Sequence, residues 1–137
     1  MTLVLDASMT LAWLFSDERS DGAERAFDEV SDGGATVPVL WWLEVANALQ
    51  KAVRRNRCDQ PYVDRSLSRL RRMSILTDEE TARHAWTTTL TLAREECLTP
   101  YDASYLELAV RRKLPLASGD SQLVEAAIRR AVPVMTI

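Results

Sequence analysis

The chain has 137 residues, of which 47% are hydrophobic and 27% charged, and this composition excludes a disordered or low-complexity protein. The length suits one core, so we expect a single domain over residues 1–137. The formal net charge of −3 does not by itself favour nucleic-acid binding. No apolar run approaches the roughly 20 residues of a membrane span, and the N-terminal segment lacks the basic start of a signal peptide. We therefore expect a cytoplasmic protein that does not bind membranes.

Short apolar runs alternate along the chain with segments of helical periodicity. Strands are predicted at residues 2–6, 35–37, 114–118 and 132–137, and residues 74–76 are predicted as a short strand or a turn. Helices are predicted at residues 7–15, 17–34, 38–57, 61–73, 78–96, 99–113 and 121–131. This alternation predicts an α/β domain with a central parallel sheet and right-handed connections between its strands.

Three acids lie where predicted strands end or predicted helices begin. Asp6 and Asp120 follow strands, and Asp102 lies in the first turn of a helix that opens with Thr99 and Pro100, a typical capping sequence. Because parallel sheets bind ligands at the carboxyl ends of their strands, these acids could share a site there. Stabilisation of a helix N-terminus, by about 0.3–1 kcal/mol, explains each acid equally well when it is taken singly.

Glu44 favours a shared site over capping. It lies too deep in its predicted helix to cap it, and "VLWWLEVANAL" surrounds it with apolar residues, which predicts a buried helix. A buried carboxylate needs a partner or becomes protonated, and no lysine or arginine lies within one turn of Glu44. An arginine from elsewhere is one solution. A metal ion that also binds the other three acids explains all four together, and such oxygen ligands select Mg²⁺ or Mn²⁺.

Arginines are concentrated in the middle of the chain. Arg65, Arg69 and Arg72 have the spacing that places side chains on one face of a helix. A solvated helix face explains this pattern without any function. The functional interpretation is contact with RNA phosphates or docking of an acidic partner.

Four fragments of the sequence, taken in order, resemble the PIN domain, and most closely the VapC type of toxin. They are "VLDAS", "LEVANAL", "TPYDASYLELA" and "LASGDSQL", and they extend over nearly the whole chain. The resemblance implies a compact three-layer α/β/α fold and a divalent-metal-dependent endoribonuclease. Its acidic quartet corresponds to Asp6, Glu44, Asp102 and Asp120.

The resemblance also extends to three supporting residues. Ser8 matches the small hydroxyl residue that usually lies two positions after the first acid. Ser118 stands where the family often has threonine, a departure that preserves the hydroxyl. Asn47, one turn after Glu44, matches the family pattern and could orient that glutamate.

The mechanism that the resemblance implies is hydrolysis of RNA. Asp6 and Asp102 would be the main metal ligands, Glu44 and Asp120 would complete the site, and the metal would activate water for attack on a phosphodiester. Family members usually form homodimers and are held inactive by a cognate VapB-type antitoxin. The alternative is a degenerate PIN fold that binds RNA or protein without catalysis, and the presence of all four acids argues against it. A haloacid-dehalogenase-like phosphatase would need an aspartate in place of Ser8.

Overall fold

The computed structural model describes residues 2–137, and its five strands pair in parallel in one sheet. The strands are β1 (Leu3–Leu5), β2 (Ala35–Val37), β3 (Ile75–Thr77), β4 (Leu116–Ala117) and β5 (Val134–Met135). Their order across the sheet is β3-β2-β1-β4-β5. The predicted parallel sheet is confirmed, and the segment predicted as a strand or a turn is the edge strand β3.

Eight α-helices and one short 3-10 helix occur within residues 2–137. The α-helices are α1 (Ala7–Leu14), α2 (Asp21–Gly33), α3 (Leu40–Arg54), α4 (Gln60–Arg71), α5 (Thr81–Ala85), α6 (Thr88–Glu96), α7 (Pro100–Arg112) and α8 (Ser121–Arg129), and the 3-10 helix is η1 (Ser16–Glu18). These helices and the sheet confirm the predicted α/β fold.

Two predicted helices differ from the observed ones for local reasons. The helix predicted at 17–34 begins at Asp21, because the Ser20 hydroxyl caps it by accepting a hydrogen bond from the Ala23 amide. The helix predicted at 78–96 is divided into α5 and α6. Thr87 leaves the helical region between them, with φ −116° and ψ −99°, and its hydroxyl donates to the carbonyl of His84 at 3.4 Å.

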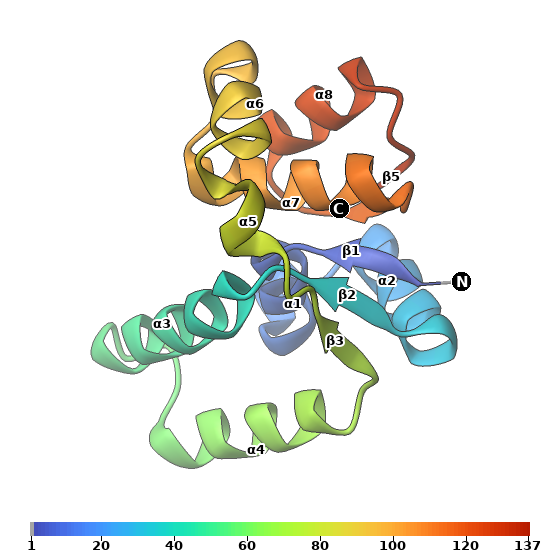
Figure 1. Cartoon of the computed structure of the whole chain (residues 1–137). Helices are drawn as coiled ribbons and strands as arrows, with labels where there is room; N and C mark the ends of the chain where they lie inside the picture. The colour runs from blue at the N-terminus through green and yellow to red at the C-terminus, as the bar shows by residue number, and fades with distance from the viewer. Residues whose placement is uncertain (1) are drawn as a thin grey trace.

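The helices form one layer on each face of the sheet. The chain moves from β1 to β2 and β3 in one direction, and from β3 across to β4 and β5 in the other. With right-handed connections, helices α1–α4 lie on one face and α5–α8 on the opposite face. Contacts agree, since α1 touches α2 and α3, whereas α7 touches α6, α8, β1 and β4. Figure 1 shows α3 and α4 on one side of the strands and α6, α7 and α8 on the other.

The direction of winding reverses between β1 and β4, which are neighbours at the centre of the sheet. In open parallel sheets, ligands bind beside the carboxyl ends of the strands at this reversal. Residues Asp6 and Ser118 directly follow these two strands. The topology therefore predicts a ligand site at the carboxyl ends of β1 and β4.

The core is formed by β1, β4 and the inner faces of α1 and α7. Leu5 and Leu116 are completely buried, as are Met9 on α1 and Leu106 on α7. Burial of each such side chain contributes about 1.5–3 kcal/mol. The packing of these four elements therefore stabilises the central strands whose carboxyl ends carry Asp6 and Ser118. No helix among the described residues is long and apolar enough to span a membrane.

Candidate active site

Asp6 follows β1 and is buried, with only 5% of its surface exposed. Its Oδ2 accepts hydrogen bonds from the hydroxyls of Ser8 at 2.6 Å and Ser118 at 2.7 Å. Burial raises the pKa of Asp6 and the charge on Asp120 raises it further, whereas the two hydroxyls act in the opposite direction. Ser8 and Ser118 therefore hold and stabilise the charged form of a carboxylate that burial disfavours.

The loop after β4 connects Asp6 to Asp120. The Ser118 hydroxyl also accepts a hydrogen bond from the Asp120 amide at 3.0 Å, and the Ser8 hydroxyl accepts one from the Gly119 amide at 2.9 Å. Asp120 caps α8, because its Oδ1 accepts from the amides of the second and third helical residues, at 2.9 and 3.2 Å. One oxygen of Asp120 is thus fixed by the helix, and Oδ2 is available to a ligand.

Asp102 lies in the first turn of α7, and its side chain is not the helix cap. Thr99 is the N-cap, with its hydroxyl 3.1 Å from the Asp102 amide, and Pro100 is the first helical residue, as predicted. The pKa of Asp102 is raised to about 6 by burial and by the charges on Asp6, Asp120 and Glu44. The Thr99 cap binds the backbone amide of Asp102 and does not use its carboxylate, so capping does not explain why an acid lies at this position.

Glu44 lies on α3, which is not apolar on every side as the sequence suggested. Trp42 is 44% exposed and Leu43 is 75% exposed, so α3 buries one face only, and Glu44 is half-buried. The hydroxyl of Tyr105, on α7, donates to Glu44 Oε1 at 2.5 Å. Asn47 is exposed, and no hydrogen bond joins it to Glu44 within residues 2–137. Burial and the charge on Asp6 raise the pKa of Glu44, and the Tyr105 hydrogen bond opposes them.

Burial and the charges of neighbouring members of the quartet raise the pKa values of Asp6, Glu44 and Asp102, and no cation neutralises these acids within residues 2–137. None of the four forms an ion pair with lysine, arginine or histidine within residues 2–137. Another buried acid at the same edge shows the contrast. Asp78 follows β3, and its Oδ2 lies 2.7 Å from Nη2 of Arg111. The absence of such a partner distinguishes the quartet from an ordinary buried ion pair.

The sequence that forms this fold and site matches a known protein family. The PIN domain family model matches residues 3–129, which is most of the chain. The chain belongs to the PIN domain family. The parallel sheet and its two helical layers are those of a PIN domain.

Solved structures show the same PIN fold. The chain resembles PAE2754 from Pyrobaculum aerophilum, with a TM-score of 0.71, 24% identity and coverage of 98% of this chain and 84% of that one. It also resembles VapBC2 from Rickettsia felis, bound to a DNA fragment from the promoter, with a TM-score of 0.65, 12% identity and coverage of 100% and 99%. FitAcB from Neisseria gonorrhoeae has a TM-score of 0.55, 17% identity and coverage of 98% and 96%. No curated protein matches the chain.

The quartet of this PIN domain fits a divalent cation in chemistry and charge. Its donors are all carboxylate oxygens, which suit Mg²⁺ or Mn²⁺. Burial and the charges of the other three acids raise the pKa of Asp102, and a bound cation would relieve the repulsion among them. No three acidic, histidine or cysteine side chains of residues 2–137 converge tightly enough to enclose an ion in their present positions. Binding would therefore draw the free carboxylate oxygens, which the protein does not hold, toward the ion.

Sequence reasoning missed Tyr105 as the partner of Glu44. Tyr105 is completely buried and lies one turn after Asp102 on the same helix. The spacing from Asp102 was visible in the sequence, because residues three apart share a helical face. The hydrogen bond between Tyr105 and Glu44 could not be predicted from the sequence, since the two residues are 61 positions apart.

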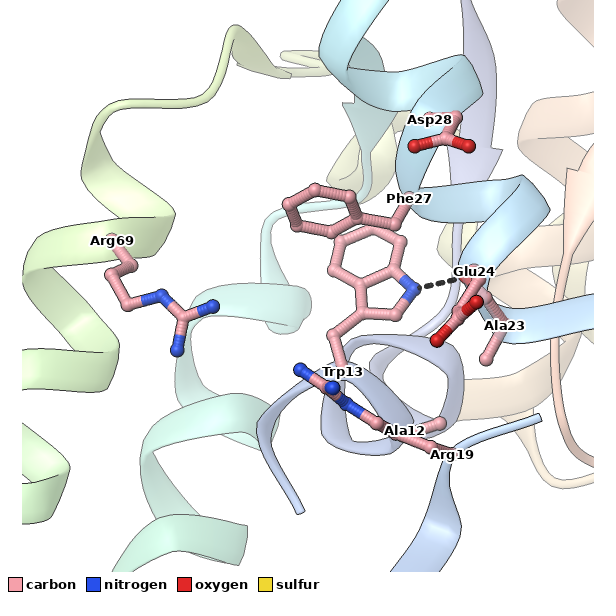
Figure 2. A pocket seen from close by; sticks show the side chains of 8 residues that line it. All are labelled: Ala12, Trp13, Arg19, Ala23, Glu24, Phe27, Asp28 and Arg69. Carbon is pink, nitrogen blue, oxygen red and sulfur yellow. Dashed lines mark hydrogen bonds between the residues drawn. The ribbon is translucent and has the colours of Figure 1, made fainter. Parts of the chain in front are cut away.

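The three predicted arginines are exposed, with Arg65 and Arg69 on α4 and Arg72 as the C-cap of that helix. A cavity separates α4 from α1 and α2, and Figure 2 shows Arg69 pointing toward it from α4. Trp13 and Phe27 form its apolar wall, with their rings edge to face at 5.3 Å. Arg65 and Arg72 line neighbouring surface hollows that also include Arg69. Arg69 therefore borders an aromatic cavity, while all three arginines are exposed to solvent.

Proposed function

We propose that this chain is a single PIN domain over residues 1–137 that acts as a divalent-metal-dependent endoribonuclease in the cytoplasm. We further propose that it is the toxin of a VapBC-type toxin–antitoxin pair. The observation that carries the proposal is a group of four carboxylates that form no ion pair within residues 2–137. Burial and the charges of the other three acids raise the pKa of Asp102 to about 6. A perturbed acid beside like charges, at the switch point of a parallel sheet, is typical of a functional site.

In this proposal, Asp6 and Asp102 hold the ion, Mg²⁺ or Mn²⁺, and Glu44 and Asp120 complete the site. Such an ion lowers the pKa of bound water and stabilises developing charge on a phosphate. The chain itself supplies orientation. Ser8 and Ser118 fix one oxygen of Asp6, and the start of α8 fixes one oxygen of Asp120. The free oxygens of these acids then face the ligand without a large loss of side-chain entropy.

The partners proposed are an RNA substrate, a VapB-type antitoxin and a second copy of the chain. The likeness to VapBC2 and FitAcB supports the antitoxin, although at their identities it is a likeness of fold. Exposed apolar side chains at the start of α3, Val39, Trp42 and Leu43, suit a homodimer contact. Asn47, exposed on the same helix, stays a predicted supporting residue.

Arg65, Arg69 and Arg72 are proposed to bind the antitoxin rather than RNA. Arg65 and Arg69 lie on α4 and Arg72 is its C-cap, whereas the quartet comes from α3, α7 and the segments that follow β1 and β4. Arg69 also stands beside the apolar wall of Trp13, which suits a protein segment that combines acidic and apolar side chains (Figure 2). Weaker antitoxin binding by the Arg65→Glu, Arg69→Glu double variant, with unchanged RNA cleavage, would support this assignment. Weaker cleavage with unchanged antitoxin binding would favour RNA contact.

The test of the nuclease proposal is cleavage of single-stranded RNA by purified wild-type, Asp6→Asn and Asp102→Asn proteins. The wild type should cleave with Mg²⁺ or Mn²⁺ and stop when the ions are chelated. Both variants should lose cleavage and still unfold cooperatively. Asp28→Asn, at an exposed position in the middle of α2, is the matched control and should cleave normally. Full activity in either site variant would contradict the metal site, and an inactive wild type that binds RNA would favour the degenerate PIN module.

A further inference from the structure

Tyr105 links the two helical layers directly above the carboxyl edge of the sheet. It lies on α7, its side chain is completely buried, and its hydroxyl donates to Glu44 Oε1 on α3. Helices α3 and α7 cover opposite faces of the sheet, so this hydrogen bond joins the layer that carries Glu44 to the layer that carries Asp102. Among the described residues, it is the only side-chain hydrogen bond to Glu44.

A buried tyrosine hydroxyl requires an acceptor, and Glu44 requires a donor. Glu44 has a long side chain with several rotatable bonds, and Asn47, the residue one turn later on the same side of α3, is exposed. Asn47 does not hold it, and no arginine or lysine is paired with it within residues 2–137. Its carboxylate would therefore sample many positions without Tyr105.

Two other acids of the quartet are also fixed through one oxygen only. Asp6 Oδ2 accepts from two serine hydroxyls, and Asp120 Oδ1 accepts from two backbone amides of α8. The Tyr105 hydrogen bond engages one oxygen of Glu44 in the same manner. Each of these carboxylates keeps its second oxygen for a ligand, while the first is held by the protein. Such outer partners orient the groups that bind metals.

We propose that Tyr105 is a positioning residue that holds Glu44 Oε1 and thereby presents the Glu44 carboxylate, already oriented, to the divalent cation of the proposed nuclease site. The inference rests on the proposed function, because it concerns the same site. Tyr105 does not contact substrate or the reacting phosphate in this role. It acts through Glu44, and its effect should therefore depend on the carboxylate of Glu44.

The test is Mn²⁺ binding by the RNA-free protein, measured by titration calorimetry, which reports on the site without catalysis. Tyr105→Phe removes one oxygen atom and should weaken Mn²⁺ binding about tenfold. Tyr62→Phe is the matched control, since the Tyr62 hydroxyl donates to the carbonyl of Leu14 at the end of α1, and its loss should leave Mn²⁺ binding unchanged. Tyr105→Met, whose flexible apolar side chain also lacks a hydroxyl, replaces Tyr105→Phe if that variant fails to fold.

Glu44→Gln separates positioning from a general structural role. Glutamine keeps an oxygen that accepts the Tyr105 hydrogen bond but removes the charge. If Tyr105 acts through Glu44, then Tyr105→Phe should change Mn²⁺ affinity by less than about twofold in the Glu44→Gln protein. An equal, roughly tenfold loss in both backgrounds would overturn the proposal, as would wild-type affinity in the Tyr105→Phe protein.

Asp102→Asn distinguishes failure of this inference from failure of the proposed function. If Asp102→Asn binds Mn²⁺ as tightly as the wild type, the metal site itself is wrong, and the role of Tyr105 falls with it. If Asp102→Asn loses Mn²⁺ binding while Tyr105→Phe keeps it, the metal site stands and only the positioning role of Tyr105 is refuted.

Discussion

The raised pKa of Asp102 predicts that Asp102→Asn stabilises the metal-free protein. The pKa of this carboxyl is about 6 in the folded chain, against an ordinary value of 3.8. The folded protein therefore binds the Asp102 proton more tightly than the unfolded chain does. Its stability falls as the pH rises from about 4 to about 6, and the penalty is complete above this range. Asparagine carries no charge and removes the penalty.

The size of the effect follows from the difference between the two pKa values. A rise of about two units corresponds to roughly 3 kcal/mol, and because Asp102 is partly open to solvent, we expect a gain of about 2 kcal/mol at pH 7.5. A chain of 137 residues has an unfolding entropy of about 0.3 kcal/mol per kelvin, so the melting temperature should rise by about 7 °C.

The assay is thermal unfolding by circular dichroism in chelator, at pH 7.5 and at pH 4. Asp102→Asn should melt above the wild type at pH 7.5 and close to it at pH 4, where the wild-type carboxyl is largely protonated. The Asp28→Asn control should match the wild type at both pH values. Added Mn²⁺ should raise the melting temperature of the wild type and leave that of Asp102→Asn unchanged. A variant that melts at or below the wild-type temperature in chelator at pH 7.5 would refute the repulsion argument.

Three further predictions concern single contacts, each measured by urea unfolding in chelator. Ser118→Ala removes a buried donor to the Asp6 carboxylate and should cost about 2 kcal/mol, and a cost below about 0.5 kcal/mol would show that this hydrogen bond does not stabilise the fold. Arg111→Met leaves Asp78 buried without a cation and should cost about 3–5 kcal/mol, whereas a neutral result would mean that the pair is dispensable. Thr99→Ala removes the cap of α7 and should cost about 1 kcal/mol, and Thr99→Ser should restore most of it.

The sequence by itself determined the order of the elements and the edge on which the site lies. Short apolar runs and helical periods are local patterns, so the parallel α/β fold could be predicted without any long-range contact. The cap formed by Thr99 and Pro100 was equally local and is confirmed. The positions of Asp6 and Asp120 after strands could also be predicted, because they depend only on the residues next to these acids in the sequence.

Only the tertiary structure decided how each acid is partnered. Glu44 was predicted to need a cation because its helix looked apolar all round, but α3 is half exposed and Tyr105 supplies a hydrogen bond from 61 positions away. Asp78 forms an ion pair with Arg111, 33 positions away, whereas no acid of the quartet forms one within residues 2–137. These outcomes depend on which helices meet across the sheet edge. Sequence spacing constrains contacts within a helix or strand, whereas the packing of separate elements brings distant charges together and thereby sets their pKa values.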